Sequence, residues 1–258
     1  MSNNTDTNKY TILFSIGMVV IVGSLLAFTA SSLKPNIQEN ERMEKQQNIL
    51  YAMGINENGA TDIKFIGTDK VAAEFSKYIS KQLTINADGT SNENLEAYLI
   101  DVKKEQAKAK NGGTRELPLF VGVKDNQTFY IIPIRGKGLW DAIWGYVALD
   151  DDMVVQGAFF DHAAETPGLG ANIKQRYFMD DFVGEKLLAE NGDFKGITVA
   201  KGNNDPKNLT KDDYEVDALA GATITGDGVS AMIKSDLKLY LPYFKNLKNG
   251  IRYYYKLP

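Results

Sequence analysis

A run of small residues near the C-terminus, 217–228, carries the strongest chemical signal in the sequence. It reads DALAGATITGDG and directly precedes a helix expected from about 227 to 241. Small residues let backbone N–H groups approach an anion, and the positive end of a helix dipole favours negative charge there. The run therefore suits a phosphate-bearing ligand. The alternative is an ordinary tight turn with Thr225 or Asp227 as the helix N-cap.

Two further glycine-rich segments precede this run. Residues 165–170 read ETPGLG and follow an expected strand beside His162, the only histidine. Residues 136–140 read GKGLW and end on Trp140. Each segment alone predicts only a turn. Three such loops at the end of one sheet would line a pocket for a planar, phosphorylated ligand. We expect His162 to be a structural histidine whose ring nitrogens are satisfied.

The composition excludes several classes of protein. The 258 residues include no cysteine, which rules out disulfides and cysteine-ligated iron–sulfur clusters in this polypeptide. One histidine gives thin support for a metal site or a serine–histidine triad, so we expect neither metal ligands nor catalytic residues. The net charge of −4 comes without a basic patch, so nucleic acid is not an expected partner.

An uncharged, apolar run extends from 11 to 32 behind a polar tail, 1–10. A helix needs roughly 20 apolar residues to cross the hydrocarbon layer, and this run is long enough. A cleaved signal peptide would have an apolar stretch of about 7–15 residues after a basic start. Here the start carries only Lys9, offset by Asp6. We therefore expect a retained transmembrane helix.

Between the anchor and 116 the sequence predicts a helical or mixed region, 33–116. Apolar spacing predicts a helix over 36–53 and a second amphipathic pattern over 63–85. The run from 101 to 115 is rich in lysine and ends in NGG, which indicates a solvated loop.

Over 117–258 the spacing of the apolar residues changes from a helical to a strand-like pattern. Strands are expected at 119–124, 128–135, 144–149 and 153–161, joined by short Asp- and Asn-rich turns. Such neighbours pair antiparallel. A helix near 175–188 and a strand near 197–201 follow. The expected fold class is α+β: an antiparallel sheet with packed helices behind one N-terminal transmembrane helix.

In this order, behind one anchor, the three loops resemble the FMN-binding domain of the C subunit of the sodium-translocating NADH:quinone reductase. The likeness includes the early QQNILYAMGI and a Lys201-Gly202 pair after a strand, so it spans nearly the whole chain. In that family FMN is bonded through its phosphate to the threonine of a D-x-x-[S/T]-G-A-T motif. The resemblance implies Thr223 as the acceptor, with Asp217, Gly221 and Ala222 completing the motif.

One departure lies inside the motif, because Ala220 stands where the family has serine or threonine. It leaves the acceptor in place but bears on how efficiently the modifying enzyme acts. Thr225 is the second choice of acceptor. The resemblance further implies that ETPGLG (Glu165 to Gly170) contacts the isoalloxazine ring, through Thr166 and Leu169, with Gly168 and Gly170 allowing close approach.

Two more residues receive a role from the resemblance. Lys201 would lie near the flavin or its phosphate, where its charge stabilises a reduced flavin. Trp140 either flanks the ring or is a buried core tryptophan.

The function implied is electron relay through covalent FMN, within a complex that passes electrons from NADH to ubiquinone and exports sodium. The implied partners are other membrane and flavoprotein subunits of the reductase and a flavin transferase. The family places the chain in the bacterial inner (cytoplasmic) membrane with its domain on the outer side. The lysine and arginine count around the anchor favours the opposite side.

Two alternatives remain at this point. One is the G subunit of the related ferredoxin-linked electron-transport complex, although the extended region 55–116 favours the longer quinone-reductase subunit. The other is a flavin-free membrane-anchored scaffold, which would have no use for an acceptor at Thr223.

Overall fold

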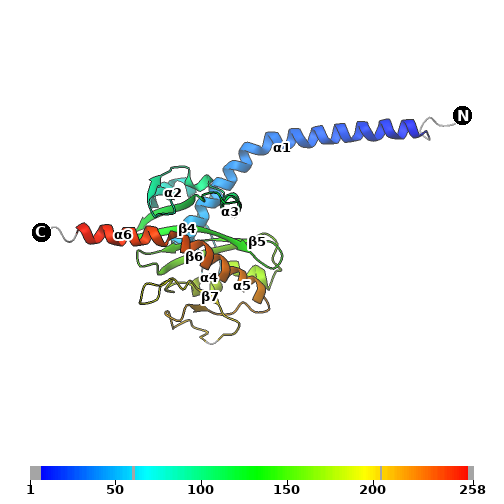
Figure 1. The fold of residues 1–258 in the computed structure, drawn as a ribbon. Helices are drawn as coiled ribbons and strands as arrows, with labels where there is room; N and C mark the ends of the chain where they lie inside the picture. The colour runs from blue at the N-terminus through cyan, green and yellow to red at the C-terminus, as the bar shows by residue number, and fades with distance from the viewer. Residues whose placement is uncertain (1–6, 60–61, 204, 255–258) are drawn as a thin grey trace. The chain divides into compact units, whose positions relative to one another are not determined.

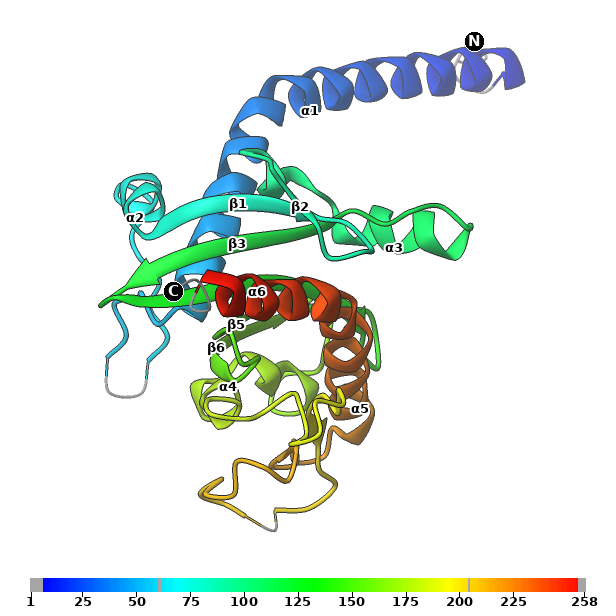
Figure 2. The same cartoon turned by 60° about the vertical axis from the view of Figure 1, so that its left-hand side comes forward.

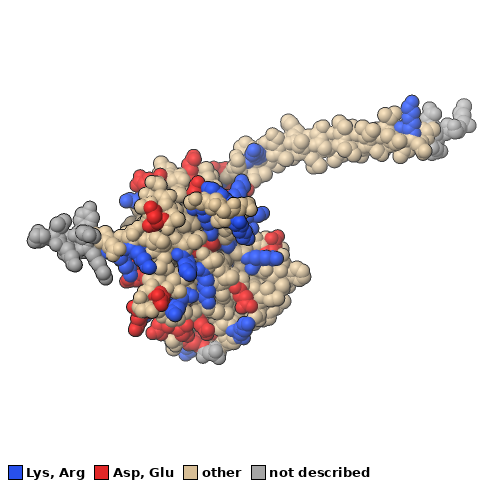
Figure 3. Space-filling view, in the orientation of Figure 1, with Lys and Arg blue, Asp and Glu red and all other residues tan. Residues whose placement is uncertain are grey.

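The computed structural model describes residues 7–59, 62–203 and 205–254, and the chain divides into two compact units, 1–44 and 45–258. The first unit is most of helix α1 (Asn8–Ala52), drawn in blue in Figure 1. Its most apolar window has a mean hydropathy of 2.4 and is wholly unburied. The sequence has no charged residue from 10 to 33, and Figure 3 shows the middle of this part of α1 free of charged side chains. By length and composition it is the one helix in the described part of the chain that would cross a membrane.

The second unit is built on a six-stranded antiparallel sheet with the strand order β2-β1-β3-β4-β5-β6 (Figure 2). The expected α+β fold is confirmed. The strands are β1 (Ile79–Ile85), β2 (Ser91–Glu93), β3 (Leu117–Lys124), β4 (Gln127–Lys137), β5 (Ala142–Leu149) and β6 (Val155–His162).

The hairpin between β3 and β4 turns at the two residues that the sequence indicated. Asp125 and Asn126 have φ values of 51° and 64°. Positive φ at both central residues fits a type I′ turn, whose twist matches that of the flanking strands. Short polar side chains tolerate this conformation better than others do, so the local sequence fixes the register of the hairpin.

Both faces of the sheet are covered, which explains why its central strands read as nearly continuous apolar runs. The end of α1 packs on one face, where Gly122 and Gly157 leave room for Met53 and for the carbonyl of Ala52. The other face carries α4 (Arg176–Asp181), α5 (Thr223–Met232) and α6 (Leu241–Tyr254). There the Phe160 ring packs against two phenylalanines of the α4 region.

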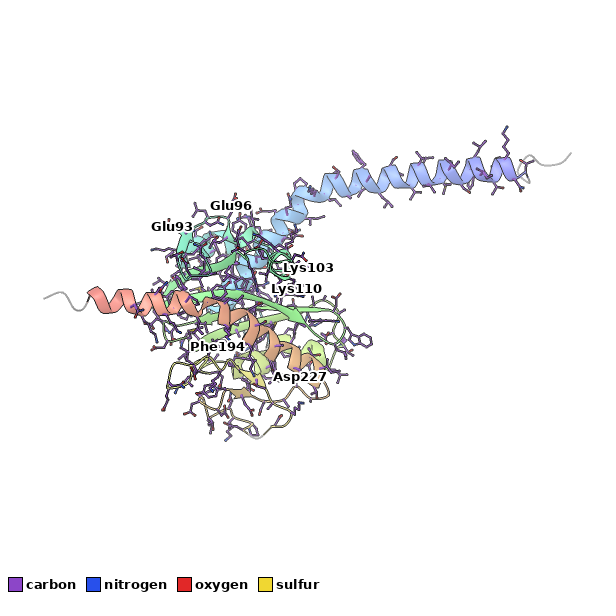
Figure 4. All side chains as sticks on the ribbon, viewed as in Figure 1. Glu93, Glu96, Lys103, Lys110, Phe194 and Asp227 are labelled. Carbon is purple, nitrogen blue, oxygen red and sulfur yellow. The ribbon has the colours of Figure 1, made fainter. Side chains whose placement is uncertain are left out.

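Three sequence predictions for the elements were wrong: the pattern over 63–85, the solvated loop over 101–115 and the length of the helix over 175–188. The pattern over 63–85 is not one helix: α2 (Val71–Tyr78) passes directly into strand β1, because Ile79, Leu83 and Ile85 are buried at a spacing that a strand also satisfies. The lysine-rich run is helix α3 (Val102–Lys110), on which Figure 4 labels Lys103 and Lys110.

The physical reasons are local. Asp101 caps α3 by accepting from the backbone N–H groups of Lys103 and Lys104, and lysine, glutamate, glutamine and alanine are good helix formers. The helix expected over 175–188 ends at Asp181, and Gly184 follows in the left-handed region at φ 87°.

Residues from 183 to 222 are mostly irregular, with one short parallel pair, β7 (Thr198–Val199) and β8 (Glu215–Val216). The strand expected over 197–201 is thus confirmed in a shorter form. Helix α5 begins at Thr223, four residues before the start expected from the sequence. It continues through a π-turn, η4 (Ile233–Leu237), and a 3₁₀ turn, η5 (Lys238–Tyr240), into α6.

Candidate functional site

The three glycine-rich loops meet at one cavity of about 230 Å³. Eight of the twelve residues singled out from the sequence line it, together with two that were not singled out. The lining residues are Leu139, Glu165, Thr166, Leu169, Gly170, Gly221, Ala222, Thr223, Ile224 and Thr225. The cavity lies where strands β4 and β6 end and helix α5 begins, so the sheet positions two of the loops and the helix positions the third.

Helix α5 presents its N-terminus to this cavity. Thr223 is its first residue, Ala222 is the N-cap, and no side chain caps the first turn. The first N–H groups of a helix have no partner within the helix, and they favour an anion. Gly221, at φ 66°, makes the turn into the helix, a conformation that glycine adopts without strain. Asp227 lies inside α5 (Figure 4) and is not the N-cap.

Two threonines of this first turn face different surroundings. Thr223 is exposed and lines the cavity. Thr225 is only 1% exposed, and its hydroxyl donates to Oε2 of Glu165 at 2.5 Å. The Thr225 hydroxyl is therefore both shielded and engaged, which leaves Thr223 as the accessible hydroxyl of the turn.

Glu165 is a buried carboxylate at the back of the cavity, 4% exposed. Its Oε1 accepts the backbone N–H of Trp140 at 2.9 Å, and its Oε2 accepts from Thr225. Burial raises the pKa of this carboxyl, but the hydrogen bonds from Thr225 and from the backbone of Trp140, Asp141 and Leu139 outweigh it and lower the pKa. Glu165 is ionised at neutral pH.

The mouth of the cavity is apolar. Leu139, Leu169 and Ile224 line it and are 45%, 42% and 57% exposed. Beside them Trp140 is 65% exposed, and its indole N–H donates to the hydroxyl of Thr166 at 3.1 Å. The alternative that Trp140 is a buried core residue was wrong. Apolar walls with a few fixed polar groups suit a planar aromatic ligand.

Lys201, Asp217 and Gly168 do not line the cavity, although Gly168 lies in the turn that does. Strand β7 packs along α5 and its continuation η4. The hydroxyl of Thr198 accepts a hydrogen bond from the ammonium group of Lys234 in η4, and the backbone N–H of Val199 donates to the hydroxyl of Ser230 in α5. Lys201 lies two residues beyond β7 and is exposed.

Asp217 follows β8, the parallel partner of β7. The pKa of its side chain is raised by burial and by the charge of Asp205. Asp217 does not line the cavity.

His162 contacts the start of the 165–170 segment, because its Nδ1 accepts the backbone N–H of Glu165 at 3.2 Å. Its Nε2 is buried without a partner, so the expected satisfied histidine is satisfied at one nitrogen only. In the described part of the chain no cluster of three or more histidine, aspartate or glutamate side chains is arranged to hold a metal ion.

Comparison with known proteins agrees with this geometry. Residues 138–238 match the FMN-binding domain family. The C subunit of the Na⁺-translocating NADH-quinone reductase of Pseudomonas aeruginosa is 28% identical over 243 residues, covering 90% of this chain and 92% of the relative. The C subunit of the Vibrio anguillarum reductase is 29% identical and covers 89% and 90%.

Two solved structures share the fold. The crystal structure of the reductase's C subunit from Parabacteroides distasonis is 30% identical, covers 82% of this chain and 96% of that chain, and gives a TM-score of 0.70. That of Shewanella oneidensis NqrC is 26% identical, covers 81% and 99%, and gives 0.61.

The residues that line the cavity all lie within 138–238, the part of the chain that matches the FMN-binding domain family, so this domain is an FMN-binding domain. The chain belongs to the family of the C subunit of the Na⁺-translocating NADH-quinone reductase.

Proposed function

We propose that this chain is the FMN-carrying electron-transfer subunit of a Na⁺-translocating NADH-quinone reductase. The observation that carries the proposal is the exposed Thr223 on the first turn of α5, at a cavity walled by all three loops. FMN, when bound, supplies the electron-transfer chemistry, and the protein supplies position and electrostatics. The chain has no need of catalytic residues of its own.

The flavin phosphate would be held at Thr223 as a phosphoester of its hydroxyl. The uncapped first turn of α5 offers N–H donors and a favourable dipole to that phosphate. By family likeness Lys201, two residues beyond β7, would add a positive charge near the phosphate. Gly221 and Ala222 carry no bulk that would keep a flavin transferase from the hydroxyl. The buried Thr225 is a poor acceptor because its hydroxyl already donates to Glu165.

The isoalloxazine ring would be held by the mouth of the cavity. Leu139 and Leu169 offer apolar surface, and Trp140, fixed by its bond to Thr166, offers an exposed aromatic side chain. These groups orient a planar ring and shield part of it from water. A partly open cavity also leaves an edge accessible, which electron exchange with a neighbouring carrier requires. We assign the flavin-binding role to residues 117–258, with 33–116 as the membrane-proximal region.

The apolar part of α1 anchors the chain in a membrane. By family likeness we place the soluble domain on the outer side of the bacterial cytoplasmic membrane. Its partners are the other membrane and flavoprotein subunits of the reductase and the transferase that attaches the flavin. The chain lacks cysteine, so single cysteines introduced into the second unit can be labelled with a membrane-impermeant maleimide in intact spheroplasts. Labelling without lysis is expected; labelling only after lysis would reverse the orientation.

The comparisons favour the quinone reductase over the ferredoxin-linked complex, because the relatives are named as the C subunit of the former. The scaffold alternative leaves the exposed Thr223 without a purpose. Copurification with ferredoxin-oxidising partners would favour the first alternative.

The decisive experiment is flavin attachment. The full chain, expressed with a flavin transferase, should give a band that fluoresces under ultraviolet light on a denaturing gel. Mass spectrometry should place FMN minus water on the Thr223 peptide. Thr223→Ala should give a dark band and a folded domain. Thr128→Ala, at an exposed threonine of β4, is the matched control and should stay fluorescent. A fluorescent Thr223→Ala protein would disprove attachment at Thr223.

A further inference from the structure

We propose that Glu165 is a positioning residue, whose carboxylate fastens the three loops of the cavity to one another and thereby sets the site that receives the flavin. The inference rests on the proposed function, because it concerns the same cavity. It assigns to Glu165 a role on the other loops and not a contact with the ring.

The carboxylate joins segments that are far apart in the chain. Oε1 accepts the N–H of Trp140, 25 residues earlier, and Oε2 accepts the hydroxyl of Thr225, 60 residues later. One side chain thus connects the loop of the exposed tryptophan, its own turn and the first turn of α5.

Two glycines leave the space that this carboxylate occupies. A β-carbon at Gly138 would meet Oε1 and the carboxyl carbon of Glu165 at 2.5 and 2.8 Å. A β-carbon at Gly170 would meet Oε2 of Glu165 and the hydroxyl of Thr225 at less than 3.0 Å. These glycines come from two of the three loops, and a side chain at either one would push the carboxylate away from its donors.

The Trp140 side of the carboxylate requires an acceptor, because Oε1 faces a backbone N–H that only donates. On the Thr225 side a glutamine amide could donate to the hydroxyl, so Glu165→Gln removes the charge and reverses that hydrogen bond. No lysine or arginine forms an ion pair with Glu165 among the described residues. Its charge is balanced by hydrogen bonds and by the N-terminus of α5, where Thr225 lies in the first turn.

The test compares attachment rates rather than folding alone. The full chain is incubated with a flavin transferase and its flavin donor, and the initial rate of FMN attachment is followed by in-gel fluorescence. The variants are Glu165→Gln, Thr225→Val, Thr225→Ser and the double variant Glu165→Gln/Thr225→Val. The melting temperature of each flavin-free chain is measured alongside.

Phe75→Leu is the control for stability. Phe75 is 4% exposed, packs against Phe120 and does not line the cavity. It should lower the melting temperature and leave the attachment rate unchanged.

We expect attachment to slow about tenfold in Thr225→Val, the size of one lost hydrogen bond to a charged group, and by a similar factor in Glu165→Gln, which replaces two charge-assisted hydrogen bonds with weaker neutral ones. Thr225→Ser, which keeps the hydroxyl, should attach FMN at the wild-type rate. The double variant should be no slower than the slower single variant, because both changes remove the same bond.

Wild-type rates in Glu165→Gln would overturn the inference. An attachment rate lowered equally in Thr225→Ser and Thr225→Val would overturn it as well. So would an attachment rate in Phe75→Leu that falls in proportion to its lower melting temperature. A wild-type chain that takes up no FMN would instead refute the proposed function, so the two failures are distinguishable.

Discussion

The guanidinium of Arg115 lies 2.8 Å from the carboxylate of Asp236, and the two side chains are only 14% and 2% exposed. The carboxylate also accepts the backbone N–H of Arg135 at 2.8 Å and the amide of Gln106 at 3.3 Å. Asp236 lies in the π-turn that continues α5, Arg135 in β4 and Gln106 in α3. This one carboxylate therefore ties the helix that carries Thr223 to the sheet.

Removing this carboxylate should destabilise the second unit strongly. In Asp236→Ala the buried Arg115 loses its counter-charge and the N–H of Arg135 loses its acceptor. Breaking a buried pair from one side costs about 3 kcal/mol. Urea unfolding of the full chain in detergent, followed by tryptophan fluorescence, would measure it.

The exposed pair between Lys77 and Glu74 provides the comparison. Lys77→Ala should leave the urea midpoint unchanged, because exposed pairs contribute little. An Asp236→Ala midpoint equal to that of Lys77→Ala would contradict the structural role of the buried pair.

The sequence predicted the sheet well and its surroundings less well. The four central strands were predictable because β-branched and aromatic runs are punctuated by turns such as Asp125-Asn126, whose conformation is a local property. Helix α3 was missed because its lysine-rich run and the following NGG indicated a solvated loop, whereas Asp101 caps a helix of good helix formers there. The strand β1 was missed because its buried residues fit both periods, and only its pairing with β3 decides between them.

Gly170 should tolerate alanine less well than Gly168 does. Gly168 has φ 76° with open space around it, so alanine there costs about 1–2 kcal/mol of backbone strain. At Gly170 the added methyl group displaces the Glu165–Thr225 bond inside a buried site. Gly170→Ala should therefore both lower the melting temperature and slow FMN attachment.

Gly112→Ala controls for strain alone, because Gly112 has φ 83°, open space and no part in the cavity. It should resemble Gly168→Ala in melting temperature and the wild type in attachment. Attachment that is unaffected by Gly170→Ala would show that the cavity absorbs the methyl group.

The loops of the site were predictable, but their internal connections were not. Glycines in 136–140 and 165–170 indicated close approach to something, and the resemblance suggested the flavin. The structure shows that Gly138 and Gly170 make room for Glu165. Nothing in a single sequence links a glutamate to a threonine 60 residues away. Leu139 and Ile224 lie inside the glycine-rich segments 136–140 and 217–228, but nothing in those segments marked their apolar side chains as cavity walls.

Ala220→Ser should speed FMN attachment without changing stability. Ala220 is exposed in the turn before α5 and stands where the family motif has a hydroxyl residue. An exposed substitution in a turn typically changes the free energy of unfolding by less than about 0.5 kcal/mol. A faster initial rate of attachment, at an unchanged melting temperature, is the expected result. Equal rates would show that the transferase does not require the hydroxyl.

Glu185 should make the second unit more stable as the pH falls from neutral towards the unfolded-state pKa of a glutamate, about 4.3. Its side chain is 0% exposed, and burial raises its pKa more than Lys211 lowers it. A folded-state pKa above the unfolded value of about 4.3 means that the folded protein binds the proton more tightly. The stabilising contribution is present at low pH and is lost as pH rises through the folded-state pKa.

Glu185→Gln should therefore flatten the change in urea midpoint as the pH falls from neutral towards the unfolded-state pKa of about 4.3. The lowered pKa of Glu165 acts in the opposite sense, with stability lost as pH falls through it, below about 4.3. The two contributions thus fall in separate ranges. An undiminished pH response in Glu185→Gln would assign the effect to another group, such as Asp181, whose pKa is also raised by burial.

Lys201→Gln should slow FMN attachment by about twofold to fivefold, the size of one exposed charge acting near a helix terminus. The reason is electrostatic: the lysine follows β7, whose Val199 is hydrogen-bonded to Ser230 of α5, and the family likeness puts its charge near the negative phosphate. Salt screens exposed charges, so the ratio of wild-type to Lys201→Gln rates should approach one at about 0.5 M salt. Lys207→Gln, at an exposed lysine further along the same irregular segment, should match the wild type at every salt concentration. A ratio that does not change with salt, or an equal loss in Lys207→Gln, would mean that Lys201 does not act on the phosphate through its charge.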